Sequence, residues 1–262
     1  IVIVRSKEKI MGSTLDLTRV PKELLFILEL LKEDNEETIQ KNQEALCKDI
    51  DWELFLECAM HHRVFPLLHS KLKTLDQHLV PASVVQYITE QYKRNTFRML
   101  QLTAEMEWIS KIFAEEGIET LFLKGPVIAQ DIYGDISLRT STDLDFLIQI
   151  NYLETAKDLL LKHNFKQTEF IKAVFSEWKW RDHHITFFHS EKNIKVEVHW
   201  RLHPGPGKEE KFQNLWNRRR KSALTKYPVH YLGREDLFNF LVIHGARHGW
   251  FRLRWLIKIQ KI

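Results

Sequence analysis

The sequence has few cysteines, and their scarcity excludes several classes of protein. Only two occur among 262 residues, Cys47 and Cys58. Two cysteines cannot form the disulfide framework of a small secreted domain, and no Cys/His spacing matches a zinc site. This usage is typical of a reducing compartment, so we expect a cytoplasmic protein without structural zinc.

Long apolar runs and a strong charge of one sign are also lacking. No uninterrupted apolar segment reaches the roughly 18 residues of a membrane-spanning helix, so we predict no membrane span. The 39 Lys and Arg residues exceed the 35 Asp and Glu residues by only four, too few to indicate a nucleic-acid partner. One basic run, residues 218–221, is interpreted as a solvated helix face, with an anionic substrate or partner as the alternative.

The composition is that of a folded protein, with 44% hydrophobic and 11% aromatic residues. Residues 18 to about 112 show helical apolar spacing, and Asp51 is predicted to cap the helix that follows it. Residues 82–116 keep this spacing throughout, which predicts one extended helix or two stacked helices. The first 12 residues are set aside as irregular or as an addition to the natural chain.

The apolar period changes at Gly117, where strand patterns begin. The patterns predict a strand, a short helix, a second strand, a second helix and a hairpin, at residues 117–124, 125–134, 142–150, 151–164 and 183–200. Glu191 and Lys192 are expected to join the two strands of the hairpin. The chain then reads as helical again, and the natural protein either ends at Ile262 or continues beyond it.

We therefore predict an α+β fold in three parts. A small mixed-sheet core, residues 113–203, lies between an N-terminal helical region, residues 1–112, and a C-terminal helical region, residues 204–262.

Two carboxylates occur in the predicted strand at residues 142–150. Side chains alternate along a strand, so Asp143 and Asp145 share one face, about 7 Å apart, while Leu144 and Phe146 point to the core. Like charges on one face repel, so the arrangement needs a nearby cation. Carboxylates are the ligands that Mg²⁺ prefers. The alternative is that the two aspartates cap neighbouring backbone at the end of the strand.

Two other features of the core can join this pair. Glu197 lies on the face of its strand opposite Val196 and Val198, so it would supply a third carboxylate if the two strands are neighbours. Lys124 and Gly125 open a predicted helix, whose first backbone N–H groups suit phosphate oxygens. A strand-to-helix turn that needs glycine is the simpler explanation of Gly125.

Four histidines near these carboxylates invite comparison with a metal site: His183, His184, His199 and His203. Neighbours in a strand face opposite ways, and Pro204 stops a helix from aligning His199 with His203, so the pattern argues against zinc. We expect His199 either to orient an acceptor or to form a hydrogen bond in the core.

The segments that carry these residues resemble a known family. The pattern comprises Lys124-Gly125, the Tyr-Gly-Asp of residues 133–135, Arg139, Asp143-x-Asp145 and Glu197 before His199-Trp200. It resembles the uncharacterised nucleotidyltransferase family, part of the DNA polymerase beta-like nucleotidyltransferase superfamily. The likeness extends to residues 51–68, to the long helix with Asn95 and to residues 244–256. Superfamily relatives usually have Gly-Ser or Gly-Gly in place of this Lys-Gly, and Asp in place of this Glu.

The resemblance implies a metal-dependent transfer of a nucleoside monophosphate from an NTP to a hydroxyl-bearing acceptor by in-line attack. It implies that the catalytic and metal-binding residues are Asp143, Asp145 and Glu197, with Mg²⁺ or Mn²⁺ as cofactor. It implies that the nucleotide, ATP among the candidates, contacts Lys124, Gly125, Arg139 and Ser141. The acceptor is expected to be a peptide or a small molecule, and nucleic acid is not expected.

Two other functions are compatible with these residues. Many glycosyltransferases that use a nucleotide-sugar also hold a metal with Asp-x-Asp after a strand, but they build a doubly wound nucleotide-binding half before that motif. About a hundred residues before this motif read as helical instead. The second alternative is a non-catalytic nucleotide-binding scaffold, which the presence of all three carboxylates disfavours.

Overall fold

The structure is a computed structural model that describes residues 18–32, 35–168, 182–205, 207 and 209–261. The predicted irregular segment at residues 1–12 lies outside these ranges. The chain forms two compact units, of which the second comprises residues 95–247. The three-part division of the chain stays a prediction. Among the described residues, no helix has both the length and the apolarity needed to cross a bilayer.

The first unit is a bundle of helices around one apolar core. Its helices are α1 (Lys22–Leu30), α2 (Glu36–Cys47), α3 (Trp52–His61), α4 (Phe65–Lys73), the first part of α5 (Ala82–Glu115) and α11 (Leu253–Lys261). Phe26 of α1 packs against Phe55 of α3, with ring centroids 5.6 Å apart. Asp51 caps α3 as predicted, because its side chain accepts hydrogen bonds from the backbone of Glu53 and Leu54 at 3.0 and 3.1 Å.

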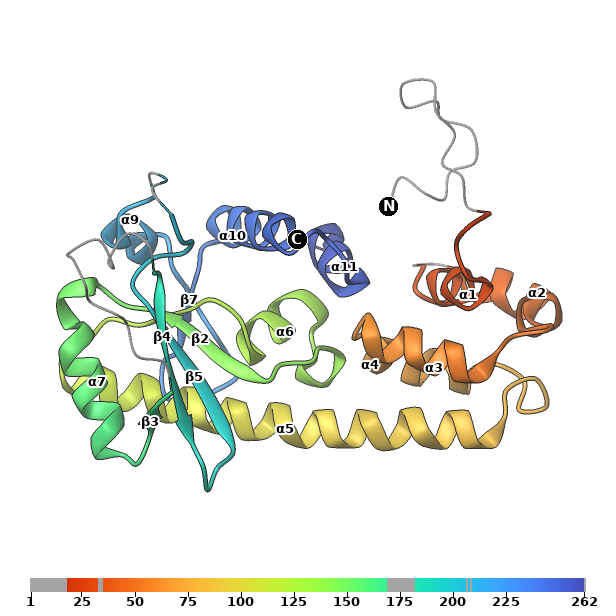
Figure 1. Ribbon diagram of the computed structural model, residues 1–262, viewed down its shortest axis with the longest axis horizontal. Helices are drawn as coiled ribbons and strands as arrows, with labels where there is room; N and C mark the ends of the chain where they lie inside the picture. The colour runs from red at the N-terminus through yellow and green to blue at the C-terminus, as the bar shows by residue number, and fades with distance from the viewer. Residues whose placement is uncertain (1–17, 33–34, 169–181, 206, 208, 262) are drawn as a thin grey trace. The chain divides into compact units, whose positions relative to one another are not determined.

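The second unit is built on a seven-stranded sheet in the order β3-β4-β5-β2-β1-β7-β6 (Figure 1). The strands are β1 (Leu121–Phe122), β2 (Asp143–Leu147), β3 (Lys166–Gln167), β4 (His184–His189), β5 (Ile194–His199), β6 (Arg220–Lys221) and β7 (His230–Tyr231). The helices are the rest of α5, α6 (Pro126–Tyr133), α7 (Leu153–Lys162), α9 (Phe212–Asn217) and α10 (Arg234–Arg247). Strand β2 runs parallel to β5 and antiparallel to β1, so the sheet is mixed and the predicted α+β fold is confirmed.

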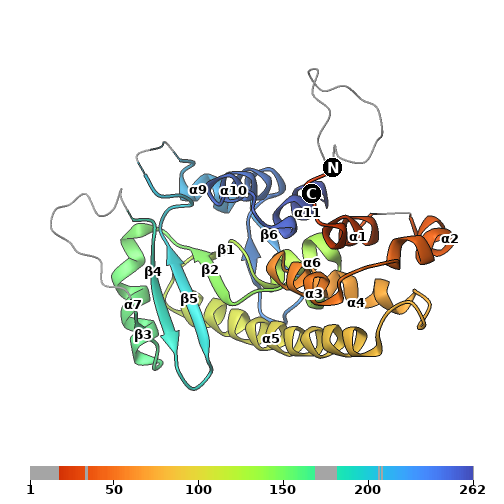
Figure 2. The same ribbon diagram turned by 45° about the vertical axis from the view of Figure 1, so that its right-hand side comes forward.

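The two faces of the sheet differ in polarity, as the alternation of side chains predicted. Phe146 of β2 is fully buried and packs edge-on against Phe113 of α5, with centroids 5.4 Å apart. It also packs against Phe122 of β1 at 5.5 Å. In both views β2, in the middle of the sheet, lies between the second half of α5, in yellow, and α10, in blue (Figures 1 and 2). The apolar face is therefore anchored on α5, and the alternate residues of β2 and β5 point away from it.

Of the two alternatives predicted for residues 82–116, the structure has the first: residues 82–115 form one extended helix. Other elements differ from their predicted extent. The hairpin connection between β4 and β5 has four residues, 190–193, instead of the predicted two, and Asn193 takes a left-handed conformation with φ 51°. Strands β6 and β7 lie in the segment predicted to be helical. The apolar pattern there did not reveal them because each has two residues.

The basic run at residues 218–221 is not a helix face. It follows the end of α9 and enters β6, and two of its arginines are held by carboxylates. Arg218 makes two hydrogen bonds to Asp236, and Arg220 makes two to Asp131 at 2.7 and 2.8 Å. These bidentate pairs give much of the run an internal structural role.

The cap of α3 yields a test of the first unit. We expect Asp51→Ala to lower the free energy of unfolding by about 1 kcal/mol, because two backbone N–H groups lose their acceptor. Asp51→Asn is the matched control, since asparagine caps about as well as aspartate and only the charge is removed. Urea unfolding of the three proteins measures the difference. Equal losses in the Ala and Asn variants would show that charge, not capping, stabilises this helix.

Candidate active site

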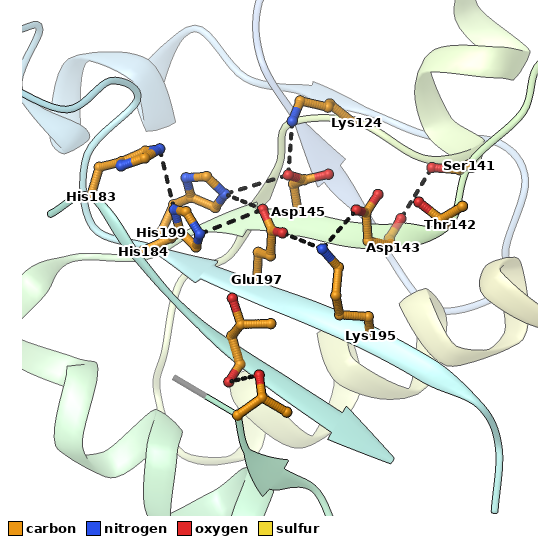
Figure 3. Close-up of polar contacts among 12 residues, drawn as sticks. Lys124, Ser141, Thr142, Asp143, Asp145, His183, His184, Lys195, Glu197 and His199 are labelled. Carbon is orange, nitrogen blue, oxygen red and sulfur yellow. Dashed lines mark hydrogen bonds and ion pairs between the residues drawn. The ribbon is translucent and has the colours of Figure 1, made fainter. Parts of the chain in front are cut away.

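The parallel pairing of β2 with β5 brings the predicted carboxylates together (Figure 3). In this register Asp143 lies opposite Lys195, and Asp145 lies opposite Glu197. Glu197 was predicted to join the aspartates only if its strand were a neighbour of theirs, and it is. Asp145 is the most enclosed of the three, with 1% of its surface exposed.

A lysine provides the cation that the paired aspartates required. The ammonium nitrogen of Lys195 lies 2.6 Å from Oε1 of Glu197 and 3.2 Å from Oδ2 of Asp143. Burial by itself lowers the pKa of Lys195, but Glu197 and Asp143 together raise it above its ordinary value. The lysine is therefore charged, and it bridges two carboxylates from neighbouring strands.

A second lysine serves Asp145. Oδ1 of Asp145 accepts a hydrogen bond from Nζ of Lys124 at 2.8 Å and lies 3.5 Å from Nε2 of His199. Burial raises the pKa of Asp145, but Lys124 and His199 outweigh it and hold the pKa well below its ordinary value. The other oxygen, Oδ2, is buried without a hydrogen-bond partner among the described residues. Such an oxygen is a ready ligand for a further cation.

His199 lies between two acidic groups and is itself almost fully buried. Its Nε2 is 3.5 Å from Asp145 and 3.6 Å from Oε2 of Glu197, distances that fit an ionic contact better than a hydrogen bond. Burial lowers the pKa of His199, whereas Asp145 and Glu197 raise it, and the net pKa lies above the ordinary value. The ligand atoms of Asp145, Glu197 and His199 lie within 4.8 Å of one another, close enough to hold one metal ion.

The Lys124-Gly125 turn borders this group because it is tied to β2. The backbone N–H of Leu123 donates to the carbonyl of Asp145 at 2.9 Å, which places Lys124 beside the carboxylate. Gly125 precedes α6 with φ 89°, and a Cβ there would lie 3.3 Å from the side chain of Leu144. The conformation therefore favours glycine, and a larger residue would also press on Leu144. The first backbone N–H groups of α6 follow directly, as an anion site would need.

The two other predicted nucleotide contacts support the turn and the strand. Arg139 is buried, and its guanidinium donates to the carbonyl of Gly125 at 3.3 Å. Ser141 donates to the backbone carbonyl of Asp143 at 3.1 Å. Asn95 of α5 fixes the segment before them by donating to the carbonyls of Ser137 and Arg139 at 2.8 and 3.1 Å. Their contact with nucleotide stays a prediction.

The histidines meet in a way that the sequence pattern did not reveal. His183 precedes β4, so strand alternation does not separate it from His184, which lies opposite His199 in the β4–β5 register. Nε2 of His183 is 3.2 Å from Nδ1 of His184, and ligand atoms of all three histidines lie within 4.8 Å of one another. His203 lies elsewhere and stacks on Phe240 at 5.5 Å. Strand alternation therefore does not exclude a metal site at His183, His184 and His199.

Protonation of two of these imidazoles can be measured directly. Burial, followed by the nearby His199 and His184, lowers the pKa of His183 to about 3, so imidazole NMR should find it neutral at pH 5. His199, with its raised pKa, should still be protonated at pH 6.5. Unfolding lets His183 take up a proton near its ordinary pKa of 6.5, so its contribution to the free energy of unfolding should fall as the pH drops below that value. An ordinary pKa at either residue would contradict the packing described.

Comparison with known proteins agrees with this geometry. A model of the uncharacterised nucleotidyltransferase family matches residues 48–262, which include every residue of the site. A search of curated proteins finds no match. The chain therefore belongs to the uncharacterised nucleotidyltransferase family, whose members are transferases.

Proposed function

We propose that this protein transfers a nucleoside monophosphate from an NTP to a hydroxyl-bearing acceptor with the help of a divalent metal ion. The observation that carries the proposal is the convergence of three carboxylates, Asp143, Asp145 and Glu197, on cationic groups at one face of the sheet. Carboxylates that already surround positive charges are suited to bind a metal ion, and the metal ion in turn would bind the triphosphate.

The donor set fits Mg²⁺ or Mn²⁺. All three side chains offer hard oxygen ligands, and Oδ2 of Asp145 is buried without a hydrogen-bond partner among the described residues. Asp143 and Glu197 share one ammonium group, so their oxygens already face a common cation. A divalent ion held there would neutralise phosphate charge and lower the pKa of the attacking hydroxyl.

The groups beside the carboxylates would bind and orient the nucleotide. Lys124 and the first N–H groups of α6 would contact phosphate oxygens and stabilise the negative charge that grows during transfer. Arg139 and Ser141 would act at the same end of the triphosphate. The acceptor oxygen then bonds to the α-phosphorus as the bond to pyrophosphate breaks. A peptide or a small molecule is the proposed acceptor.

The carboxylates yield the main test of this proposal. We expect Asp143→Ala, Asp145→Ala and Glu197→Gln each to slow NTP turnover by at least about 100-fold, because each removes a ligand of the metal. Pyrophosphate release from ATP, GTP, CTP and UTP with Mg²⁺ or Mn²⁺ measures turnover. Asp158→Ala, which removes an exposed carboxylate on α7, is the control and should leave turnover unchanged.

The same assay separates the rival functions. Undiminished turnover in any of the three site variants would overturn its assignment. Nucleotide binding without pyrophosphate release in the native protein would favour a scaffold, and thermal stabilisation by a nucleotide-sugar alone would favour a glycosyltransferase.

Lys195 gives an independent test that does not depend on turnover. Its ammonium group competes with any metal ion for Asp143 and Glu197, so Lys195→Met should bind Mn²⁺ more tightly, by up to about tenfold. Titration followed by electron paramagnetic resonance measures the affinity. Lys166→Met removes the same charge from an exposed position on β3 and should leave the affinity unchanged. If both variants raised the Mn²⁺ affinity equally, Lys195 would act only through the net charge of the protein and not through its contacts with Asp143 and Glu197.

A further inference from the structure

Three imidazoles meet at the open end of the β4–β5 hairpin, next to the carboxylates (Figure 3). His184 and His199 face each other across the two strands, with ring centroids 4.9 Å apart. His183 lies against both, at 4.4 Å from the ring of His184 and 5.4 Å from that of His199. Ligand atoms of all three lie within 4.8 Å of one another.

The carboxylate of Glu197 closes this group on one side. Its Oε2 lies 3.9 Å from Nε2 of His184 and 3.6 Å from Nε2 of His199. The opposite oxygen, Oε1, contacts Lys195. One carboxylate oxygen of Glu197 therefore contacts the lysine, and the other contacts the imidazole nitrogens of His184 and His199.

His199 gives a second, independent indication of a ligand. It is 3% exposed, and neither of its ring nitrogens has a hydrogen-bond partner among the described residues. Its Nε2 has ionic contacts with Asp145 and Glu197, whereas its buried Nδ1 has no hydrogen-bond partner among the described residues, which is costly unless a ligand satisfies it. Ligand atoms of His183 and His184 lie within 4.8 Å of those of His199, so an ion held among the three rings would supply the missing partner.

We propose that His183, His184 and His199, together with Glu197, bind one transition-metal ion, Zn²⁺ or Co²⁺ in preference to Mg²⁺. Imidazole suits zinc, cobalt and related metals, whereas Mg²⁺ selects oxygen ligands. The site adjoins the oxygen ligands Asp143 and Asp145, and the inference rests on the proposed function in that Glu197 is shared and His199 contacts Asp145.

The backbone around the three imidazoles is fixed, so only side chains need to move. The N–H of Trp200 donates to the carbonyl of His183 at 3.1 Å, which ties the residue before β4 to the end of β5. Ligand atoms around a tetrahedral zinc ion lie about 3.3 Å apart, given Zn–N distances near 2.0 Å. Modest rotation of the rings would bring separations of up to 4.8 Å to that value.

Cobalt provides a direct test, because its visible absorption reports nitrogen-rich, low-coordinate surroundings. We expect the full chain to bind one equivalent of Co²⁺ with intense visible bands, in the presence of millimolar Mg²⁺, and Zn²⁺ to displace it. His183→Gln and His184→Gln should each weaken Co²⁺ binding at least tenfold. His78→Gln, an exposed histidine outside the cluster, is the control and should not change it.

A measurement on the native protein covers the case in which a variant fails to fold. One equivalent of Zn²⁺ should shift the imidazole ¹⁵N resonances of His183, His184 and His199 and leave that of His78 in place. Absence of these shifts, or Co²⁺ bands unaffected by both folded histidine variants, would overturn the proposal.

One variant separates this proposal from the proposed function. Asp143→Ala should abolish Mg²⁺-dependent turnover and keep the Co²⁺ bands. Loss of the bands in Asp143→Ala would show that cobalt had bound at the carboxylates and would overturn the imidazole site. If the native protein turns over NTP but does not bind cobalt, only the imidazole site is wrong. If it binds cobalt but does not turn over NTP, only the transferase mechanism is wrong.

Discussion

The parallel pairing of β2 with β5 is the constraint on which the rest of the candidate site depends, because its register places each of the three carboxylates. Asp143 meets Lys195 and Asp145 meets Glu197 across this one pair of strands. A slip of one residue would turn every side chain of β2 to the other face, so that Leu144 faced the lysines and Asp145 faced the core. The packing of Phe146 against Phe113 of α5 opposes such a slip, since it commits that face of β2 to the apolar side.

The buried carboxylates then require positively charged side chains beside them. A fully buried aspartate is stable only when opposite charges compensate for lost hydration, and here Lys124 and His199 do so. The two lysines belong to different elements, one at the turn before α6 and one on β5. Asp143 and Glu197 therefore depend on the lysine of β5 and Asp145 on the lysine of the turn, so the site assembles only when the sheet and the turn are both in place.

The sequence was sufficient for the α+β fold class, the strand at β2, the carboxylate pair and the cap at Asp51, because each depends on local periodicity or on one residue type. It also predicted that Glu197 would lie beside the two aspartates if its strand were a neighbour of theirs. It did not reveal Lys195 as the bridging cation, although alternation placed that residue on the face of Glu197. Which strand lies beside which is decided by long-range packing, and local patterns do not carry it.

The histidines also show that local sequence patterns do not determine which side chains meet. The sequence pattern places His183 in a strand, but β4 begins one residue later, at His184, so alternation does not separate the two side chains. Strands β6 and β7 were missed because two residues give no period to detect. Asn95 was marked only by family resemblance, and its two hydrogen bonds to the segment before β2 supply the physical reason.

The lysine between Asp143 and Glu197 has a consequence for assembly. Carboxylates that lacked a cation would repel and loosen the strands that carry them, so that the sheet would form only with metal bound. Here the chain brings its own positive charge to that position, and Lys124 brings another to Asp145. The charge balance of the sheet therefore does not depend on a metal ion, so any ion held by these carboxylates would bind to strands that are already paired.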